Sequence, residues 1–212
     1  MFYSKSNLFN SMKKIFLSFV TVAIVHLSAY SQATFIPKIG LAFARTSGDD
    51  ISDEEAKTGL LVGAAFNLPL DEDLISLQPE VLYIQKGTKQ DGSRLRRRFN
   101  YVEVPILVKV SIGTDQIKGY FNAGPSLGFG VSSKQRLTDD SYGKVTFGGD
   151  PGFAKRIDVG LQFGGGVGFE AGPGSLILDL RYGVGLLNVY EDRSLKNRAL
   201  ALSLGYALPL GQ

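Results

Sequence analysis

Alternation of apolar with small or polar residues from Arg156 to Leu210 is the feature that most constrains the fold of this chain. Within residues 157–170 the odd positions hold Ile, Val, Leu, Phe, Gly, Val and Phe, and the even positions hold Asp, Gly, Gln, Gly, Gly, Gly and Glu. Successive side chains of a strand point to opposite faces, so each strand here has one apolar face and one small, polar face. The small face fits the tight interior of a closed barrel, so the apolar face must meet lipid.

Eight segments of this kind predict an all-β fold, namely an eight-stranded antiparallel up-and-down transmembrane β-barrel. Tilted membrane strands need about 9–11 residues to cross the hydrocarbon core, and the segments are long enough for this. The predicted strands are residues 35–45, 58–68, 74–86, 99–110, 117–131, 156–170, 175–188 and 198–210.

The connections between these segments alternate in length, which also favours a membrane barrel. Short connections built of turn residues are 69–73, 111–116 and 171–174. Longer ones are 46–57, 87–98, 132–155 and 189–197. Short periplasmic turns and long extracellular loops are typical of outer-membrane barrels, whereas a soluble barrel has no reason to sort its loops in this way.

The N-terminal residues 1–31 are predicted to be a cleavable signal peptide. A basic pair ending at Lys14 precedes an apolar run, and Ala29-Tyr30-Ser31 fits a small-x-small cleavage site. The apolar run is shorter than the roughly 20 residues of a spanning helix, which disfavours the alternative of an uncleaved anchor. Cleavage near Ser31 would leave residues 32–212 as one barrel domain in the outer membrane of a Gram-negative bacterium.

Several residue types are missing from the predicted mature chain. The sequence has no Cys and no Trp, and its single His, His26, lies in the predicted signal. Cys–His and Ser–His catalysis, histidine metal sites and disulfides are therefore excluded, and we predict a non-enzymatic protein without cofactor or metal. The net charge of +3 comes from Lys5, Lys13 and Lys14 in the signal, so the alkaline pI is no argument for nucleic acid.

Charged residues fall at inward-facing positions of the predicted strands. An eight-stranded barrel is just wide enough for side chains to fill it, and an unpaired buried charge costs several kcal/mol, so these groups should pair. We expect Glu80, Glu103 and Arg181 to share one network; a structural plug is favoured over a hydrolytic dyad or a proton path. The predicted ion-pair network comprises Lys38, Glu80, Glu103, Lys109, Asp158, Asp179 and Arg181. Lys86, Lys118 and Glu170 also fall at inward positions, as do the apolar Leu82 and Ile84.

Three further features lie in loops or resemble known motifs. An arginine cluster is predicted to contact lipopolysaccharide phosphates, which guanidinium groups suit; it comprises Arg94, Arg96, Arg97 and Arg98. Residues 49–55 are acidic, but they lack EF-hand spacing, so solvated charge is favoured over a calcium site. Residues 164–168 superficially suggest a nucleotide loop, yet the following Lys-Ser/Thr is absent, so small inward residues explain them better.

Several strand motifs resemble the PorT-like outer-membrane β-barrel family over nearly the whole mature chain. They are Gln78-Pro79-Glu80-Val81-Leu82-Tyr83, Tyr101-Val102-Glu103-Val104-Pro105-Ile106-Leu107, Ala123-Gly124-Pro125, Asp158-Val159-Gly160 and Arg181-Tyr182-Gly183-Val184-Gly185-Leu186. The resemblance implies an eight-stranded outer-membrane barrel, and the namesake of the family is associated with type IX secretion. Residues 203–210 also resemble a terminal-strand assembly signal, although the usual aromatic last residue is absent.

Three functions are compatible with these patterns. The first is a non-enzymatic outer-membrane barrel with a filled polar interior that presents its loops, residues 132–155 above all, in a structural, adhesive or partner-docking role. The second is a secretion-associated subunit, and the third is a soluble periplasmic, lipocalin-like carrier whose apolar residues would point inward. The expected partners are outer-membrane lipid, lipopolysaccharide and the barrel-assembly machinery, together with secretion-system proteins in the second case, but no nucleic acid.

Overall fold

The fold was analysed in a computed structural model, which describes residues 33–47, 54–71, 74–90, 96–114, 116–138, 141–143, 147, 155–189 and 195–211. The strands are β1 (Thr34–Ser47), β2 (Glu54–Asp71), β3 (Ile75–Gln90), β4 (Arg96–Gly113), β5 (Ile117–Thr138), β6 (Ser141–Gly143), β7 (Ile157–Ala171), β8 (Gly174–Asn188) and β9 (Lys196–Pro209). Within these ranges no helix has the length and apolar character needed to cross a membrane.

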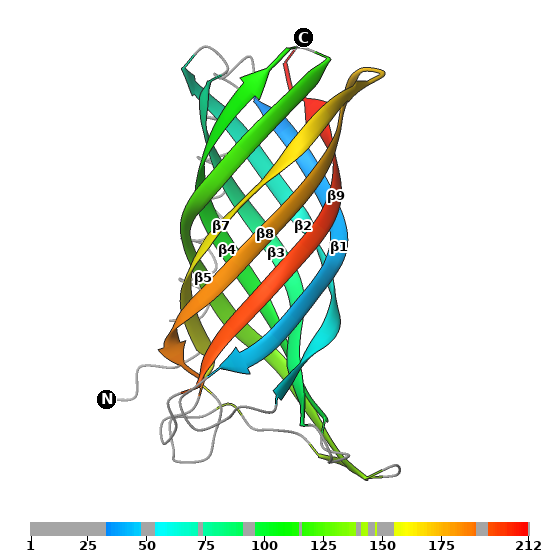
Figure 1. Ribbon diagram of the computed structural model, residues 1–212, viewed down its shortest axis with the longest axis vertical. Coiled ribbons are helices and arrows are strands. Elements are labelled where there is room, and N and C mark those ends of the chain that lie inside the picture. The colour runs from blue at the N-terminus through cyan, green and yellow to red at the C-terminus, as the bar shows by residue number, and fades with distance from the viewer. Residues whose placement is uncertain are drawn as a thin grey trace, which may run out of the picture.

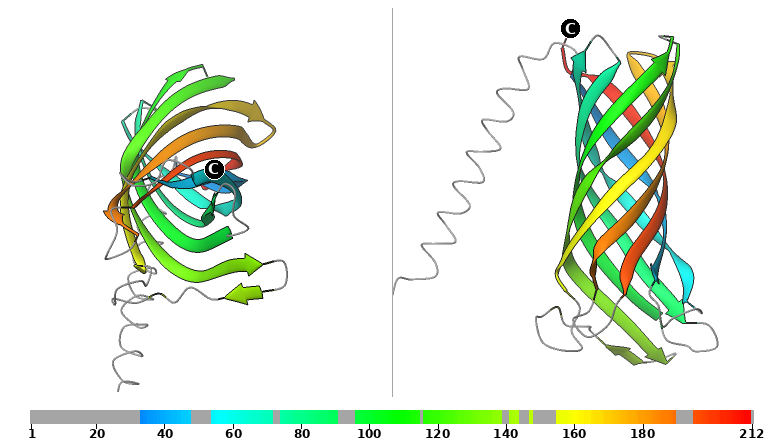
Figure 2. Two further views of the ribbon diagram at one scale, coloured as in Figure 1. Left: turned by 60° about the horizontal axis from the view of Figure 1, so that its bottom comes forward. Right: turned by 60° about the vertical axis from the view of Figure 1, so that its left-hand side comes forward.

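Eight of these strands close an antiparallel barrel, which confirms the predicted fold class. Each wall strand pairs with its neighbour in the chain, and β1 pairs with β9 to complete the ring (Figure 1). Closure removes the exposed strand edges that an open sheet would leave. The short β6 lies outside this ring and pairs only with the end of β5; the resulting hairpin projects beyond the barrel (Figure 2).

The two ends of the barrel differ in their connections. Short turns join β2 to β3, β4 to β5 and β7 to β8, and these turns lie at the top of Figure 1 with the C-terminal end of β9. The strand ends that lead into the long connections lie at the bottom. We call these the turn end and the loop end. The main difference from the predicted bounds is at β5, which runs to Thr138 because it continues into the β6 hairpin.

Exposure alternates along the strands and separates an apolar outer face from the interior. In β9 Leu202 and Leu204 are 43% and 51% exposed, whereas Ser203 between them is 5% exposed. Large apolar side chains of the other wall strands, such as Ile39 and Val81, are exposed in the same way. A soluble carrier with apolar residues inside is therefore wrong, because these residues face outward and the charged ones are enclosed.

Apolar layers also occupy the interior near both ends. The loop-side apolar cluster comprises Ala42, Leu61, Leu82, Ile84, Phe99, Tyr101, Val189 and Leu195. A smaller turn-side cluster comprises Ile36, Ala65, Ile177 and Ala207. Leu82 and Ile84, which interrupt the polar pattern of the inward positions, thus pack in the loop-side cluster. Glu170, which was also predicted to face inward, is exposed because it lies at the turn end of β7.

Candidate functional site in the barrel interior

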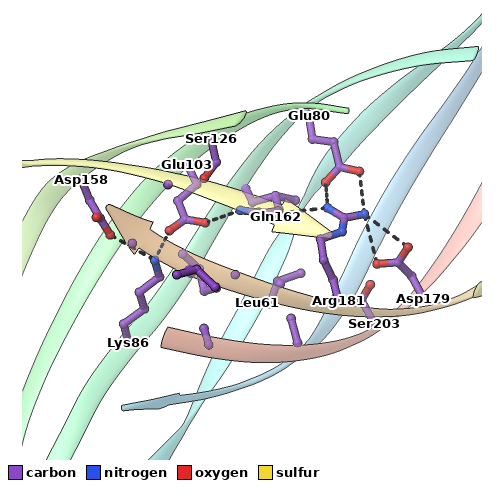
Figure 3. A pocket seen from close by; sticks show the side chains of 18 of the residues that line it. Leu61, Glu80, Lys86, Glu103, Ser126, Asp158, Gln162, Asp179, Arg181 and Ser203 are labelled. Carbon is purple, nitrogen blue, oxygen red and sulfur yellow. Dashed lines mark hydrogen bonds and ion pairs between the residues drawn. The ribbon is translucent and has the colours of Figure 1, made fainter. Parts of the chain in front are cut away.

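Arg181 of β8 lies at the centre of the first group of interior charges, which we call the Arg181 cluster (Lys38, Glu80, Asp179 and Arg181). Its Nη1 and Nη2 donate hydrogen bonds to Glu80 Oε2 at 2.8 Å and Oε1 at 3.2 Å. Nη2 also lies 3.1 Å from Asp179 Oδ1, and Lys38 Nζ donates to Glu80 Oε1 at 2.9 Å. All four side chains are buried, so two cations and two carboxylates neutralise one another across the lumen. Figure 3 shows Arg181 between Glu80 and Asp179.

Neutral polar side chains saturate the carboxylates of this cluster. Gln78 Nε2 donates to Glu80 Oε1 at 2.6 Å. Tyr120 Oη donates to Asp179 Oδ2 at 2.7 Å, and Asn122 Nδ2 donates to the same atom at 3.3 Å. Buried charges are tolerated only with such additional hydrogen bonds, so these neighbours belong to the same structural unit.

A second group lies closer to the loop end and consists of Lys86, Glu103 and Asp158, which we call the Lys86 cluster. Lys86 Nζ forms an ion pair with Glu103 and lies 3.3 Å from Asp158 Oδ2. Asn197 Nδ2 donates to Asp158 Oδ2 at 2.9 Å. Lys86 was predicted to face inward, and the structure makes it the cation shared by two carboxylates.

Gln162 of β7 joins the two clusters. Its Nε2 donates to Glu103 Oε2 at 3.0 Å, and its Oε1 accepts from Arg181 Nη1 at 3.4 Å (Figure 3). Glu80, Arg181 and Glu103 are therefore connected through a neutral amide. Sequence reasoning did not single out Gln162, although its even position in β7 placed it on the inward face.

Lys109 is the one residue of the predicted network that stands apart from the carboxylates. It is 8% exposed and lies near the turn end, with its Nζ 4.1 Å from the centre of the Tyr120 ring. Within the described part of the chain Lys109 forms no ion pair. A cation over an aromatic face gains some attraction, but this is less than a carboxylate would supply.

The space between the two clusters is too small for a substrate. It measures about 40 Å³ and is lined by Glu80, Glu103, Asp158, Gln162 and Arg181 among others. Such a volume holds only a few water molecules. Every carboxylate there already accepts bonds from cations or amides, so the arrangement is suited to filling the lumen rather than to activating a nucleophile. Among the described residues no group of His, Cys, Asp or Glu could hold a metal ion.

The inward glycines of β7 make room for this packing. A Cβ at Gly166 would lie 2.5 Å from the hydroxyl oxygen of Tyr120, the group that donates to Asp179. The residues that superficially suggest a nucleotide loop therefore lie within a strand of the wall. Their small size lets side chains from β5 and β8 reach across the lumen.

The predicted loop sites lie largely beyond what the structure describes. Arg94 is outside the described residues, and only the backbone of Arg96 and Arg97 is described, as part of β4. Arg98 is exposed. Of the acidic residues of the first long loop, Asp49, Asp50 and Asp53 lie outside the described residues, and Glu54 and Glu55 are described only as backbone. Most of the 132–155 connection beyond β5 and β6 is likewise outside the described residues.

The chain is similar to several solved structures at low sequence identity. The neisserial surface protein A is 17% identical with a TM-score of 0.51, and the match covers 84% of this chain and 99% of that one. Ail, the attachment invasion locus protein of Yersinia pestis, is 17% identical with a TM-score of 0.49, covering 84% and 99%. OprG from Pseudomonas aeruginosa is 11% identical with a TM-score of 0.49, covering 84% and 97%. The likeness to the neisserial surface protein A concerns the fold alone.

Family membership rests on the sequence itself. A comparison with curated proteins finds no match. The family model described as "Outer membrane protein beta-barrel domain", however, matches residues 25–191, which is most of the chain. That match agrees with the closed ladder, the apolar outer face and the enclosed charges. The chain belongs to the outer membrane protein beta-barrel domain family.

Proposed function

We propose that this outer-membrane barrel is non-enzymatic and that it acts through the segments it presents at its loop end, in partner docking or adhesion. The observation that carries the proposal is the filled lumen. The Arg181 cluster, Gln162 and the Lys86 cluster extend across the interior in one chain of hydrogen bonds. An eight-stranded barrel filled in this way has no open channel, so it supports neither a conducting pore nor an internal catalytic pocket.

A transport assay and a loop exchange would test the two halves of this proposal. The purified barrel in planar lipid bilayers should give no steady conductance; a reproducible open level would contradict the filled lumen. Replacing residues 139–154 with a short Gly-Ser link should preserve heat-modifiable migration, the signature of a folded barrel. In a deletion strain, the same variant should fail to restore the binding of cells to their partner surface. Full restoration would show that this loop takes no part in adhesion or docking.

Lipopolysaccharide contact at the loop end is supported by exposed basic residues on neighbouring strands. Arg45 of β1 lies directly opposite Arg198 of β9, and both are exposed, as is Arg98 of β4. Directly opposed like charges destabilise a sheet, whereas a phosphate between two guanidinium groups would accept bonds from both.

The test of this contact is the double variant Arg45→Gln, Arg198→Gln, measured by binding of refolded barrel to lipopolysaccharide-containing vesicles. Weaker binding that is lost in high salt supports the contact. The double variant Arg45→Lys, Arg198→Lys, which keeps both positive charges, is the control and should bind as the parent does. Equal binding by both variants would contradict this part of the proposal.

A secretion-associated role is the alternative, and the strand motifs shared with the PorT-like family favour it. The resembling residues include Tyr101, Glu103 and Pro105, all of them buried in the wall or lumen, where they build the barrel. Co-purification with translocon components and failed cargo export in a deletion strain would support this role; normal export would reject it. Recognition of residues 203–210 by the assembly machinery would be tested by truncating the last strand and following membrane insertion.

A further inference from the structure

A second and larger cavity opens at the turn end of the lumen, on the opposite side of the Arg181 cluster from the loop end. Its volume is about 170 Å³, compared with about 40 Å³ for the space between the two clusters. Asn67, Ser76, Lys109, Lys118 and Tyr120 line one side of it. By the usual orientation of outer-membrane barrels, the short turns face the periplasm, so this cavity is reached from there.

Lys109 is a buried cation in the wall of this cavity. It is 8% exposed, and its Nζ lies 4.1 Å from the centre of the Tyr120 ring. Within the described residues it forms no ion pair. The nearby Arg181 cluster cannot neutralise it, because its two carboxylates are already matched by Lys38 and Arg181. A buried charge without a counterion is unfavourable, so an anion in the cavity would remove a cost that the fold otherwise bears.

Uncharged hydrogen-bond donors line the cavity together with Lys109. Ser76 Oγ donates to Asn67 Oδ1 at 2.7 Å. The NH₂ group of the same Asn67 amide takes no part in that bond, so it can donate a hydrogen bond to a ligand. Within the described residues this NH₂ group donates no hydrogen bond. The cavity wall also includes the hydroxyl-bearing Ser111 and Ser175, with no carboxylate among the lining residues. Lysine, amide and hydroxyl donors together form a typical set for phosphate oxygens.

We propose that the turn-end cavity binds a small oxyanion of the phosphate type from the periplasmic side, with Lys109 as its counterion. The volume admits a phosphate group, and Ile177 and Ala207 on the opposite wall leave room for a short apolar substituent on it. The competing occupant is ordered water between Lys109 and the side-chain Oδ1 of Asn122. Asn122 lies opposite Lys109 in register, and within the described residues its Oδ1 accepts no hydrogen bond. This inference does not depend on the loop-end function proposed above.

The test uses the full mature barrel refolded in nanodiscs of phosphatidylcholine and labelled for NMR. Titration with inorganic phosphate should shift the amide signals of β4 and β5 around Lys109 and Tyr120 in a saturable manner. Lys109→Met should weaken binding by about tenfold or more, the loss expected for one charge-assisted hydrogen bond. Lys109→Arg should retain it. Lys196→Met, which removes an exposed charge at the loop end, is the matched control and should bind as the parent does.

A second arm identifies the source of the oxyanion. Nanodiscs that contain phosphatidylglycerol should give the same shifts without added phosphate only if a lipid headgroup reaches the cavity. If neither probe shifts these signals, or if Lys109→Met and Lys196→Met bind phosphate as tightly as the parent, the cavity holds water and the proposal is wrong. This outcome is decided by comparing Lys109→Met with the parent and with Lys196→Met. It therefore stands even if Lys109→Arg does not fold.

Discussion

The two ends of the lumen are closed in different ways. At the loop end an apolar cluster that includes Leu82, Ile84 and Tyr101 fills the interior, and Phe147 packs against it. At the turn end the polar cavity beside Lys109 remains. Apolar packing excludes both water and ions, whereas polar walls admit them. The difference teaches that, within the described residues, hydrophobic packing fills the lumen at the loop end, whereas a cavity with polar walls remains at the turn end.

The largest loss of stability is expected when the charge network between the two ends of the lumen is broken. Glu80→Ala removes the carboxylate that accepts bonds from Lys38, Gln78 and Arg181. It leaves the buried Lys38 without its ion-pair partner and Arg181 with Asp179 alone. We expect the free energy of unfolding to fall by about 3–5 kcal/mol, measured by urea unfolding in lipid vesicles. Glu170→Ala, at an exposed carboxylate, is the control and should change stability by less than about 0.5 kcal/mol. Similar losses in both variants would show that the network does not hold the barrel together.

The next largest loss of stability is expected when a charge is placed on the lipid-facing wall instead of in the lumen. Leu202→Arg places a charge in the middle of the outer face, and it should cost about 2–4 kcal/mol in the same unfolding measurement. Leu210→Arg, beyond the end of β9, should cost about 0–1 kcal/mol because it lies near the interface. If the outer face met water instead of lipid, Leu202→Arg would change the free energy of unfolding little, and no more than Leu210→Arg.

A smaller effect is expected at the loop-end seal. Ile84→Val removes one methylene from a side chain that is 3% exposed, which should cost about 0.5–1.5 kcal/mol. Ile112 is 73% exposed, so Ile112→Val should be nearly neutral. Equal unfolding midpoints for the two variants would mean that the loop-side cluster is loosely packed, and the comparison between the ends would fail.

The smallest change is expected at the turn end. Lys109→Met replaces a buried cation without an ion pair by an apolar side chain of similar length, and such replacements are often neutral or stabilising. The free energy of unfolding, measured without phosphate, should therefore stay the same or increase. A loss of more than about 1 kcal/mol would show that Lys109 stabilises the barrel through contacts of its own.

Sequence alternation was enough to predict the closed barrel and the inward side of the charged residues in the two clusters, because a strand has a period of two. It could not predict how far along the barrel axis each charge lies. That position depends on the stagger between neighbouring strands, which alternation does not encode. For this reason Lys109 shares a face with the carboxylates but lies apart from them, and Gln162 was missed as the link between clusters. The extension of β5 depends on pairing with β6, which lies outside the barrel wall.

The ion pairs that cross the lumen have a consequence for biogenesis. Glu80 and Arg181 are 101 residues apart in the chain, and Lys86 meets Asp158 from a strand in the other half. A partly assembled ribbon would hold each of these groups without its counterpart while facing hydrocarbon, a costly state. These ion pairs form only when the ring is closed, so they raise the free energy of partly closed intermediates relative to the complete barrel. We therefore expect insertion into the membrane and closure of the ring to proceed together.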